Sequence, residues 1–399
     1  MTGMNRLDKT IFTAIFFSIF SAVMGVGIVV PLLPVYASDL GASGFYIGMI
    51  FAAFSLSRTF LLPLFGRLSD HTGRKPYITI GMLGYALVSV AFVFSDSVSS
   101  LILVRFIQGI ASAMIMPVAQ AYIGDITPKS KEGTTMGLFN LSMFGGLSIG
   151  PLAGGMLNDM MGMDAAFIGM GLLSLAGFFF SQFILPPTRE EMVVRQRRAP
   201  VKWKRILRDR SLCGLLTLRF SYVFCIGTIW CFLPILASGY ELSSFQIGIL
   251  VMLGVLVSGL LQLPMGIMAD HRNKRVMAVC GSLIITLAIG SYHWAAGFWS
   301  LFAINVVFGI GGGIAMPPLM AMAVIKGNEI HAMGSVMSLL TVAHSLGMLL
   351  GAAVTGVVMD VFTLRQAFPL AGILMLSGAV VFAICTYGQP DTEIKEKIF

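Results

Sequence analysis

Long apolar runs alternate with short polar connections along the whole chain. A helix needs about 20 apolar residues to cross a bilayer, and twelve runs reach that length. They cover residues 11–36, 44–66, 77–95, 99–124, 133–158, 164–185, 212–237, 243–266, 276–294, 299–324, 332–358 and 364–387. Since open strands and loops cannot satisfy their backbone groups in lipid, this pattern predicts an all-α membrane protein with twelve transmembrane helices.

One connection is longer than the others. Residues 186–211 are polar and basic and divide the chain. We therefore expect one six-helix bundle over residues 1–185, a cytosolic linker over 186–211, and a second six-helix bundle with a short tail over 212–399. Residues 202–208 mix basic, Trp and aliphatic side chains, which predicts a short helix on the anionic membrane surface.

Composition and charge also indicate a membrane protein. The chain is 57% hydrophobic and 11% charged, whereas soluble domains carry about 25% charged residues. Most Lys and Arg fall in the connections on the same side as the termini, and the opposite connections carry acids. This asymmetry predicts a multi-pass protein of the inner (plasma) membrane with both termini in the cytosol. It also explains the net charge of +8 without a nucleic-acid partner.

The residues that would support chemistry are sparse. The five cysteines lie in apolar runs without paired spacing, so we expect neither disulfides nor a metal site. The spans hold no cluster of His, Asp and Glu and no arrangement around a nucleophile, which predicts no enzyme activity and no cofactor. We expect a monomer in the lipid bilayer that binds a small molecule, with protons as a second ligand to be tested.

The two halves of the chain are related to each other. A shift of about 200 residues aligns Leu33-Pro34 with Leu233-Pro234 and Asp70-His71 with Asp270-His271. Chance similarity between apolar segments would not align prolines and loop aspartates together. The sequence therefore predicts two parallel six-helix repeats around an axis normal to the membrane, an arrangement found in secondary transporters.

The connection between the second and third spans, residues 66–76, carries the most specific motif. It resembles the corresponding connection of the major facilitator superfamily, with matches at Gly66, Leu68, Asp70, Gly73, Arg74 and Lys75. The resemblance implies that Asp70, together with Arg74 and Asp125, forms a conformational latch at the start of the eleventh helix, around residues 328–333. Gly66 allows close backbone approach, and Gly73 allows a turn with positive φ.

The fifth span is rich in glycine and resembles a signature of antiporters in this superfamily. Glycines four residues apart let another helix approach closely, and the residues concerned are Gly146, Gly150, Pro151, Gly154 and Gly155. The first span ends in paired glycines and prolines between residues 24 and 34, which predicts a bend. That span resembles the drug/proton antiporter branch, but residues 20–23 (Phe-Ser-Ala-Val) replace the acid that several members carry.

Ionisable residues inside spans are costly and therefore point to function. Arg105 and Gln108 of the fourth span resemble a superfamily motif, which implies a coupling role for a buried Arg105 that faces the first helix. Arg58, Arg219 and His344 lie deep in other spans, while all acids fall in loops or at helix ends. We expect these three to bind substrate, and either His344 or a rim acid such as Asp39 or Asp125 to carry protons if protons drive transport. Neutral polar candidates for the same site are Asn140 and Gln262.

Together these features predict a secondary active transporter that exports amphipathic small molecules by alternating access. Proton antiport, drug efflux and drug resistance are hypotheses that rest on the resemblance. One alternative is a uniporter or exchanger of organic anions or lipid-like molecules without proton coupling. Another is a membrane receptor with the same fold. As an alternative to substrate binding, the arginines would bond to helix carbonyls and to Asn140, Gln262 or chloride.

Overall fold

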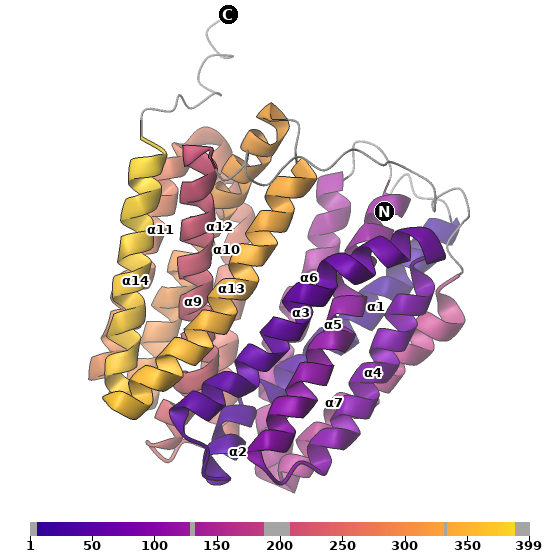
Figure 1. The fold of residues 1–399 in the computed structure, drawn as a ribbon, viewed down its shortest axis with the longest axis horizontal. Helices are drawn as coiled ribbons and strands as arrows, with labels where there is room; N and C mark the ends of the chain where they lie inside the picture. The colour runs from indigo at the N-terminus through magenta and orange to yellow at the C-terminus, as the bar shows by residue number, and fades with distance from the viewer. Residues whose placement is uncertain (1–5, 128–131, 187–207, 331–332, 388–399) are drawn as a thin grey trace, which may run out of the picture.

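The computed structural model of this protein describes residues 6–127, 132–186, 208–330 and 333–387 and is all-helical there (Figure 1). Eleven helical segments are long and apolar enough to cross a membrane, and α6 is the twelfth span. This confirms the predicted fold class. In chain order the elements are α1 (Arg6–Val29), α2 (Leu33–Asp39), α3 (Gly44–Thr72), α4 (Lys75–Val93), α5 (Val98–Ile126), α6 (Glu132–Met161), α7 (Met163–Phe179), η1 (Phe180–Ile184), α9 (Arg210–Ser238), α10 (Ser244–His271), α11 (Lys274–Ser291), η3 (Tyr292–Trp294), α12 (Phe298–Glu329), α13 (Met333–Val361) and α14 (Leu364–Cys385).

Three helices run further than their apolar runs. The helix α3 continues to Thr72, α10 to His271 and α12 to Glu329, where the sequence predicted polar connections. Hydropathy indicates where a helix leaves the lipid, but the helical hydrogen bonds of the backbone can continue beyond that point into water. The predicted surface helix at 202–208 lies almost wholly within residues 187–207, outside the described residues.

The first span is broken as predicted. α1 ends at Val29 and α2 begins at Leu33, since prolines at positions 31 and 34 have no N–H to continue the ladder. The amide of Leu32 still donates to the carbonyl of Val29 at 3.1 Å, so the break is a tight turn. It changes the direction of the chain without exposing much backbone.

The helices form two groups with the same pattern of neighbours (Figure 1). We name residues 6–186 the N-half and residues 208–387 the C-half. In the N-half, α1 packs against α6 and α7, and α3 against α5; in the C-half, α9 packs against α13 and α14, and α10 against α12. The halves meet where α3 lies against α13 and α6 against α10. We interpret them as the two predicted repeats.

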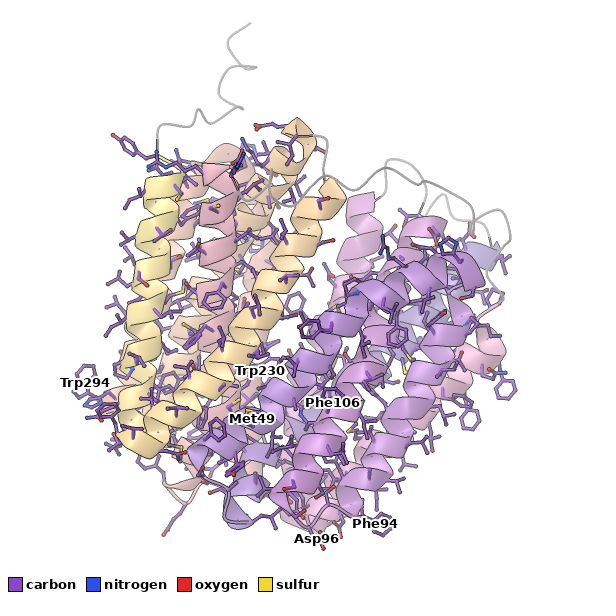
Figure 2. All side chains as sticks on the ribbon, in the orientation of Figure 1. Met49, Phe94, Asp96, Phe106, Trp230 and Trp294 are labelled. Atoms are coloured by element: carbon purple, nitrogen blue, oxygen red, sulfur yellow. The ribbon has the colours of Figure 1, made fainter. Side chains whose placement is uncertain are left out.

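Both chain ends lie on one side of the molecule (Figure 1), which we call the terminal side; the opposite side is the distal side. Large aromatic side chains are exposed on the distal side, with Phe94 at 78%, Trp294 at 75% and Trp299 at 76%, and Figure 2 shows Phe94 and Trp294 there with Asp96. Such aromatic rings are typical of the interface between lipid and water. They place the distal side at one membrane surface.

Candidate functional site

Two of the predicted site residues contact each other directly in the C-half. Nη2 of Arg219, on α9, lies 3.0 Å from Nδ1 of His344, on α13. Because a guanidinium can only donate, Nδ1 of His344 is the acceptor and carries no proton in this arrangement. Nη1 of Arg219 also lies 3.4 Å from the sulfur of Met316, on α12. Three helices thus hold one arginine–histidine pair.

Arg58 approaches the same region from the N-half. It lies on α3, and together with Arg219 it acts electrostatically on His344. Its Nε is buried and has no hydrogen-bond partner among the described residues. The ionisable side chain that acts on Arg58 is Tyr85 of α4. The structure therefore brings Arg58, Arg219 and His344, which we name the cation cluster, into one electrostatic neighbourhood between the halves.

The cation cluster has no acidic partner in the part of the chain that the structure describes. The ion pairs found there lie at helix ends on the terminal side, at Arg74 and Lys326. Tyr222 lies near Arg219 and Tyr85 near Arg58, and both phenols are uncharged at neutral pH. Burying unbalanced positive charge is costly, so the arrangement suits an anion that enters from outside.

The two neutral candidates are less closely tied to this cluster. Asn140 is exposed on α6, and Gln262 is half-buried on α10. Within the described residues, no hydrogen bond joins either amide to Arg58, Arg219 or His344. Both remain predictions as substrate contacts.

Arg105 is 3% exposed and lies among aromatic rings. Its guanidinium carbon is 4.6 Å from the centre of the Phe54 ring and 4.9 Å from that of Phe51. Its Nη1 donates to Oε1 of Gln108 at 2.6 Å, and the amide of Gln108 lies 3.9 Å from the sulfur of Met170. Arg105 is buried as predicted, but its ring contacts come from α3 rather than from the first helix, since α5 packs chiefly against α3.

On the terminal side, Arg74 joins two acids of the N-half. Its Nη1 lies 2.5 Å from Asp70 and its Nε 3.2 Å from Asp125. Next to it, Lys75 donates to the carbonyl of Gln182 at 2.8 Å. The structure therefore brings together Asp70, Arg74 and Asp125 as the motif implied.

Two glycines of this motif behave differently. Gly73 has φ +93° and forms the predicted positive-φ turn. The expectation of close backbone approach at Gly66 is wrong, because a Cβ there would meet nothing within 4 Å. Gly66 lies inside the extended α3, which projects beyond its neighbours. The predicted contact of Asp70 with residues 328–333 falls partly on 331–332, outside the described residues.

The glycine-rich stretch of α6 packs against two neighbours. A Cβ at Gly146, Gly150 or Gly154 would meet the backbone of α1, which confirms that these glycines allow close packing. A Cβ at Gly155 would meet the backbone of α10, in the other half, and the carbonyl of Pro151 also contacts α10. The distal end of this signature therefore lies at the junction of the halves.

Asp159, just beyond that signature, binds the start of α10. Its two carboxylate oxygens accept from the backbone amides of Ser244 and Phe245, each at 2.9 Å. The neighbouring Asn158 donates its amide to Oγ of Ser244 at 2.8 Å. These bonds cross from the N-half to the C-half on the distal side.

A second acid makes the same contact with the roles of the halves exchanged. Asp360, at the end of α13, accepts from the backbone amides of Gly44 at 2.6 Å and Phe45 at 2.8 Å, at the start of α3. Sequence reasoning treated both acids only as charges of the distal loops. Their near-equal spacing (Asp159 and Asp360, Gly44 and Ser244) is the signal that could have paired them.

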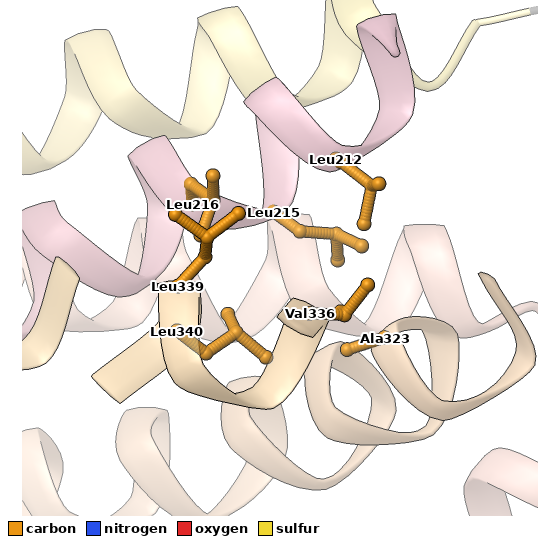
Figure 3. Close-up of a pocket in the computed structure, with 7 residues that line it drawn as sticks. All are labelled: Leu212, Leu215, Leu216, Ala323, Val336, Leu339 and Leu340. Atoms are coloured by element: carbon orange, nitrogen blue, oxygen red, sulfur yellow. The ribbon is translucent and has the colours of Figure 1, made fainter. Parts of the chain in front are cut away.

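A further crevice opens between α9, α12 and α13 in the C-half (Figure 3). Five leucines, Val336 and Ala323 line it. No polar side chain is available there to orient a ligand. We therefore place the candidate site at the cation cluster.

Two related six-helix halves around polar midplane residues define a secondary transporter of the alternating-access type. The family profile described as "Major Facilitator Superfamily" matches residues 15–235 and 215–398, so the chain belongs to the major facilitator superfamily. It is a membrane transporter of small molecules and not an enzyme.

Relatives of known sequence cover nearly the whole chain. An uncharacterized MFS-type transporter, MJ1560 of Methanocaldococcus jannaschii, is 29% identical over 96% of this chain and 99% of its own length. The quinolone resistance protein NorA of Staphylococcus aureus is 26% identical over 95% of this chain and 97% of its own length. Multidrug resistance protein 2 of Bacillus subtilis is 27% identical over 93% of this chain and 94% of its own length.

Solved structures share the fold at low identity. A bacterial homolog of the human lysosomal transporter Spinster, in an inward-facing and unoccupied conformation, has a TM-score of 0.81 at 13% identity, covering 96% of this chain and 98% of that one. The human organic anion transporter MFSD10 has a TM-score of 0.66 at 18% identity, covering 94% of this chain and 99% of that one. At these identities the likeness concerns the fold.

Proposed function

We propose that this transporter exports amphipathic organic anions from the cytosol by alternating access. The observation that supports this most is the cation cluster, which has no carboxylate partner among the described residues. An unbalanced arginine in a membrane interior costs at least about 2.5 kcal/mol. A carboxylate, sulfonate or phosphate of the substrate would offset that cost through charge-assisted hydrogen bonds, which guanidinium groups form in pairs.

The surroundings of the cluster favour a substrate with an apolar body. Arg219 contacts the sulfur of Met316, and Tyr85 and Tyr222 lie within electrostatic range of the arginines. Methionine and aromatic side chains present adaptable apolar surface. An anionic head bound by the cluster, with an aromatic or aliphatic body against these side chains, fits this composition.

Export from the cytosol is supported by three observations. The basic connections on the terminal side indicate that this side is cytosolic in the inner or plasma membrane. The hydrogen bonds that join the halves among the described residues all lie on the distal side, which favours access to the cluster from the cytosol. Two relatives are named for resistance to quinolones and to multiple drugs.

Transport of three fluorescent probes by proteoliposomes tests the substrate class. Dansylglycine is anionic, dansylglycinamide is neutral and of nearly the same size, and dansylcadaverine is cationic. Replacing Arg58 or Arg219 with Gln should raise the concentration for half-maximal dansylglycine transport at least about tenfold, because a hydrogen bond to a charged group contributes about 1.5–3 kcal/mol.

The controls separate charge recognition from general damage. The same substitutions should change transport of dansylglycinamide by less than about twofold, and Arg272→Gln, which removes an exposed charge, should change neither. Equal transport of dansylcadaverine, with no charge discrimination in either arginine variant, would contradict the proposal. If no probe is transported, the receptor hypothesis is the better one.

Proton-driven export is a second candidate, and the Arg219–His344 pair favours it. Protonation of Nδ1 would remove the acceptor of that hydrogen bond and place two positive charges 3.0 Å apart. Proton binding and the contact with Arg219 therefore compete, as coupling requires. The acids lie in loops or at helix ends, so the rim acids Asp39 and Asp125 are the alternative carriers.

His344→Gln separates this candidate from simple exchange. The variant should lose the response of dansylglycine transport to a pH gradient and keep its downhill exchange within about twofold, since an amide can still accept from Arg219. Full gradient-driven transport by the variant would remove His344 from the coupling mechanism. Exchange that never responds to pH in the wild type would favour the anion exchanger without proton coupling.

A further inference from the structure

The starts of α3 and α10 are completed by the opposite half of the molecule. The first amides of a helix have no partner within it. At α10, Ser243 accepts from the amide of Gln246, while the preceding amides, of Ser244 and Phe245, bond to Asp159. At α3, the side chain of Ser43 caps no amide. The first two amides of that helix bond to Asp360 instead.

These two contacts coincide with the closest approach of the halves. A Cβ at Gly155 would meet the backbone of Ser244 and Phe245, and one at Gly356 would meet the backbone of Gly44 and Phe45. The carboxylates therefore act where the backbones already touch, next to the positive end of a helix dipole. Each acid can bond to both amides only while the halves stay together on the distal side.

From this geometry we propose that Asp159 and Asp360 form a two-point distal lock, which holds the transporter closed on the distal side until both carboxylates leave the partner helix. The two points lie at different edges of the junction, α6–α10 and α3–α13, and hold the halves from opposite sides. When the halves separate, water replaces each carboxylate at the amides. The lock is therefore reversible, and its strength sets the balance between the two open states.

Cys231 provides a native reporter of this lock. It lies on the distal part of α9, is 0% exposed and lies within electrostatic range of Arg105 of the N-half, so it is covered where the halves meet. An impermeant maleimide, added from the distal side to intact cells, should label it only when that side opens. A parallel Cys231→Ala protein assigns the labelling to this thiol.

The lock predicts graded opening. Asp159→Asn and Asp360→Asn should each raise the labelling rate of Cys231 about fivefold, and the double variant about 25-fold, as expected for two independent caps of about 1 kcal/mol each. Asn keeps the size of the side chain and removes the charge and one acceptor. Asp164→Asn, which changes an exposed acid of the same surface, should leave the rate unchanged.

The measurement needs no substrate, so it can fail while the proposed function stands. Labelling of Cys231 that stays at the wild-type rate in both single variants and the double variant would overturn the lock. So would an equal increase in Asp164→Asn. Elution of each variant as a single peak on size exclusion excludes misfolding, and if the double variant does not fold, the two single variants decide the question.

Discussion

The two sides of this transporter hold their charges in different ways. On the distal side, Asp159 and Asp360 each bond to backbone amides of the other half. On the terminal side, the described ion pairs stay inside one half: Arg74 binds Asp70 and Asp125 in the N-half, and Lys326 binds acids of the C-half. Among the described residues, the carboxylates that join the halves lie on the distal side, and the acids of the terminal side pair within their own half.

This difference indicates how the transporter changes state. We propose that the motif around Asp70 engages the opposite half in the other conformation. One set of acids would then bond across the halves in each state. In this proposal, the present conformation, in which the halves are joined on the distal side, is the one that loads substrate from the cytosol.

The largest expected effect comes from adding a methyl group where the halves touch. Gly155→Ala with Gly356→Ala inserts a Cβ against backbone atoms of the other half and should keep the distal side from closing. Overpacking costs about 1–3 kcal/mol per site, so dansylglycine transport should fall at least about tenfold, with increased labelling of Cys231. The measurement is initial transport rate at equal protein density.

The matched control for this prediction is Gly137→Ala with Gly266→Ala, one position inside α6 and the other inside α10. These positions have open space within 4 Å, and Ala favours helix as much there as in the test pair. Transport by this control should stay near the wild-type rate. Equal losses in the two double variants would show that the contact between the halves has no special role.

A smaller change in the conformational balance is expected from a substitution on the terminal side. Asp70→Asn removes one partner of Arg74 but leaves Asp125 in place, and the Asp70 side chain is 53% exposed, so folding should lose less than about 1 kcal/mol. If Asp70 stabilises the other state by bonding across the halves, Asp70→Asn should raise the inward-facing population by about threefold. A cysteine at the exposed position Thr341, one turn from His344, should then react faster from the cytosolic side.

Asp270→Asn is the matched variant of the second half. Asp270 occupies the repeated position, in the last turn of α10, and the segment around it has lost part of the motif. It should leave the labelling of the Thr341→Cys protein unchanged. An Asp70→Asn protein that labels like the wild type would count against the latch.

The smallest effect is expected from the hydrogen bond between Asn158 and Ser244. It links the halves at 2.8 Å but involves no charge, and a neutral hydrogen bond contributes about 1 kcal/mol or less. Asn158→Ala should raise labelling of Cys231 by about twofold to fivefold. Adding Ser244→Ala should produce no further increase, and an additive increase would mean that the two side chains act separately.

The sequence predicted the features that depend on the membrane and on local chemistry. The starts of eleven spans fall within two residues of the observed helices, because bilayer thickness and polar connections set them. The turn at Gly73 follows from the conformational freedom of glycine. Burial of Arg105 followed from a motif.

Contacts between distant segments were the part that could not be predicted. Asp159 and Asp360 lie just beyond apolar runs, in the last turns of α6 and α13, and nothing local distinguishes them from the exposed Asp164. Their bonds depend on which side of the molecule is closed. The ring contacts of Arg105 and the open surroundings of Gly66 could not be predicted either, because both depend on how neighbouring helices pack.

The most direct measurement of the central claim compares both sides of the transporter in one experiment. Spin labels carried on unnatural amino acids can replace exposed residues of the repeat, Phe94 and Trp294 on the distal side or His71 and His271 on the terminal side. Pulsed electron spin resonance then reports each distance across the halves, without and with dansylglycine.

We predict that dansylglycine lengthens a fraction of the distal distances and shortens a matching fraction of the terminal distances. Asp159→Asn with Asp360→Asn should produce the same opposite changes without any ligand, because the distal lock is already released. Distances that change in the same direction on both sides, or that stay unchanged in this double variant, would contradict alternating access controlled by the two carboxylates.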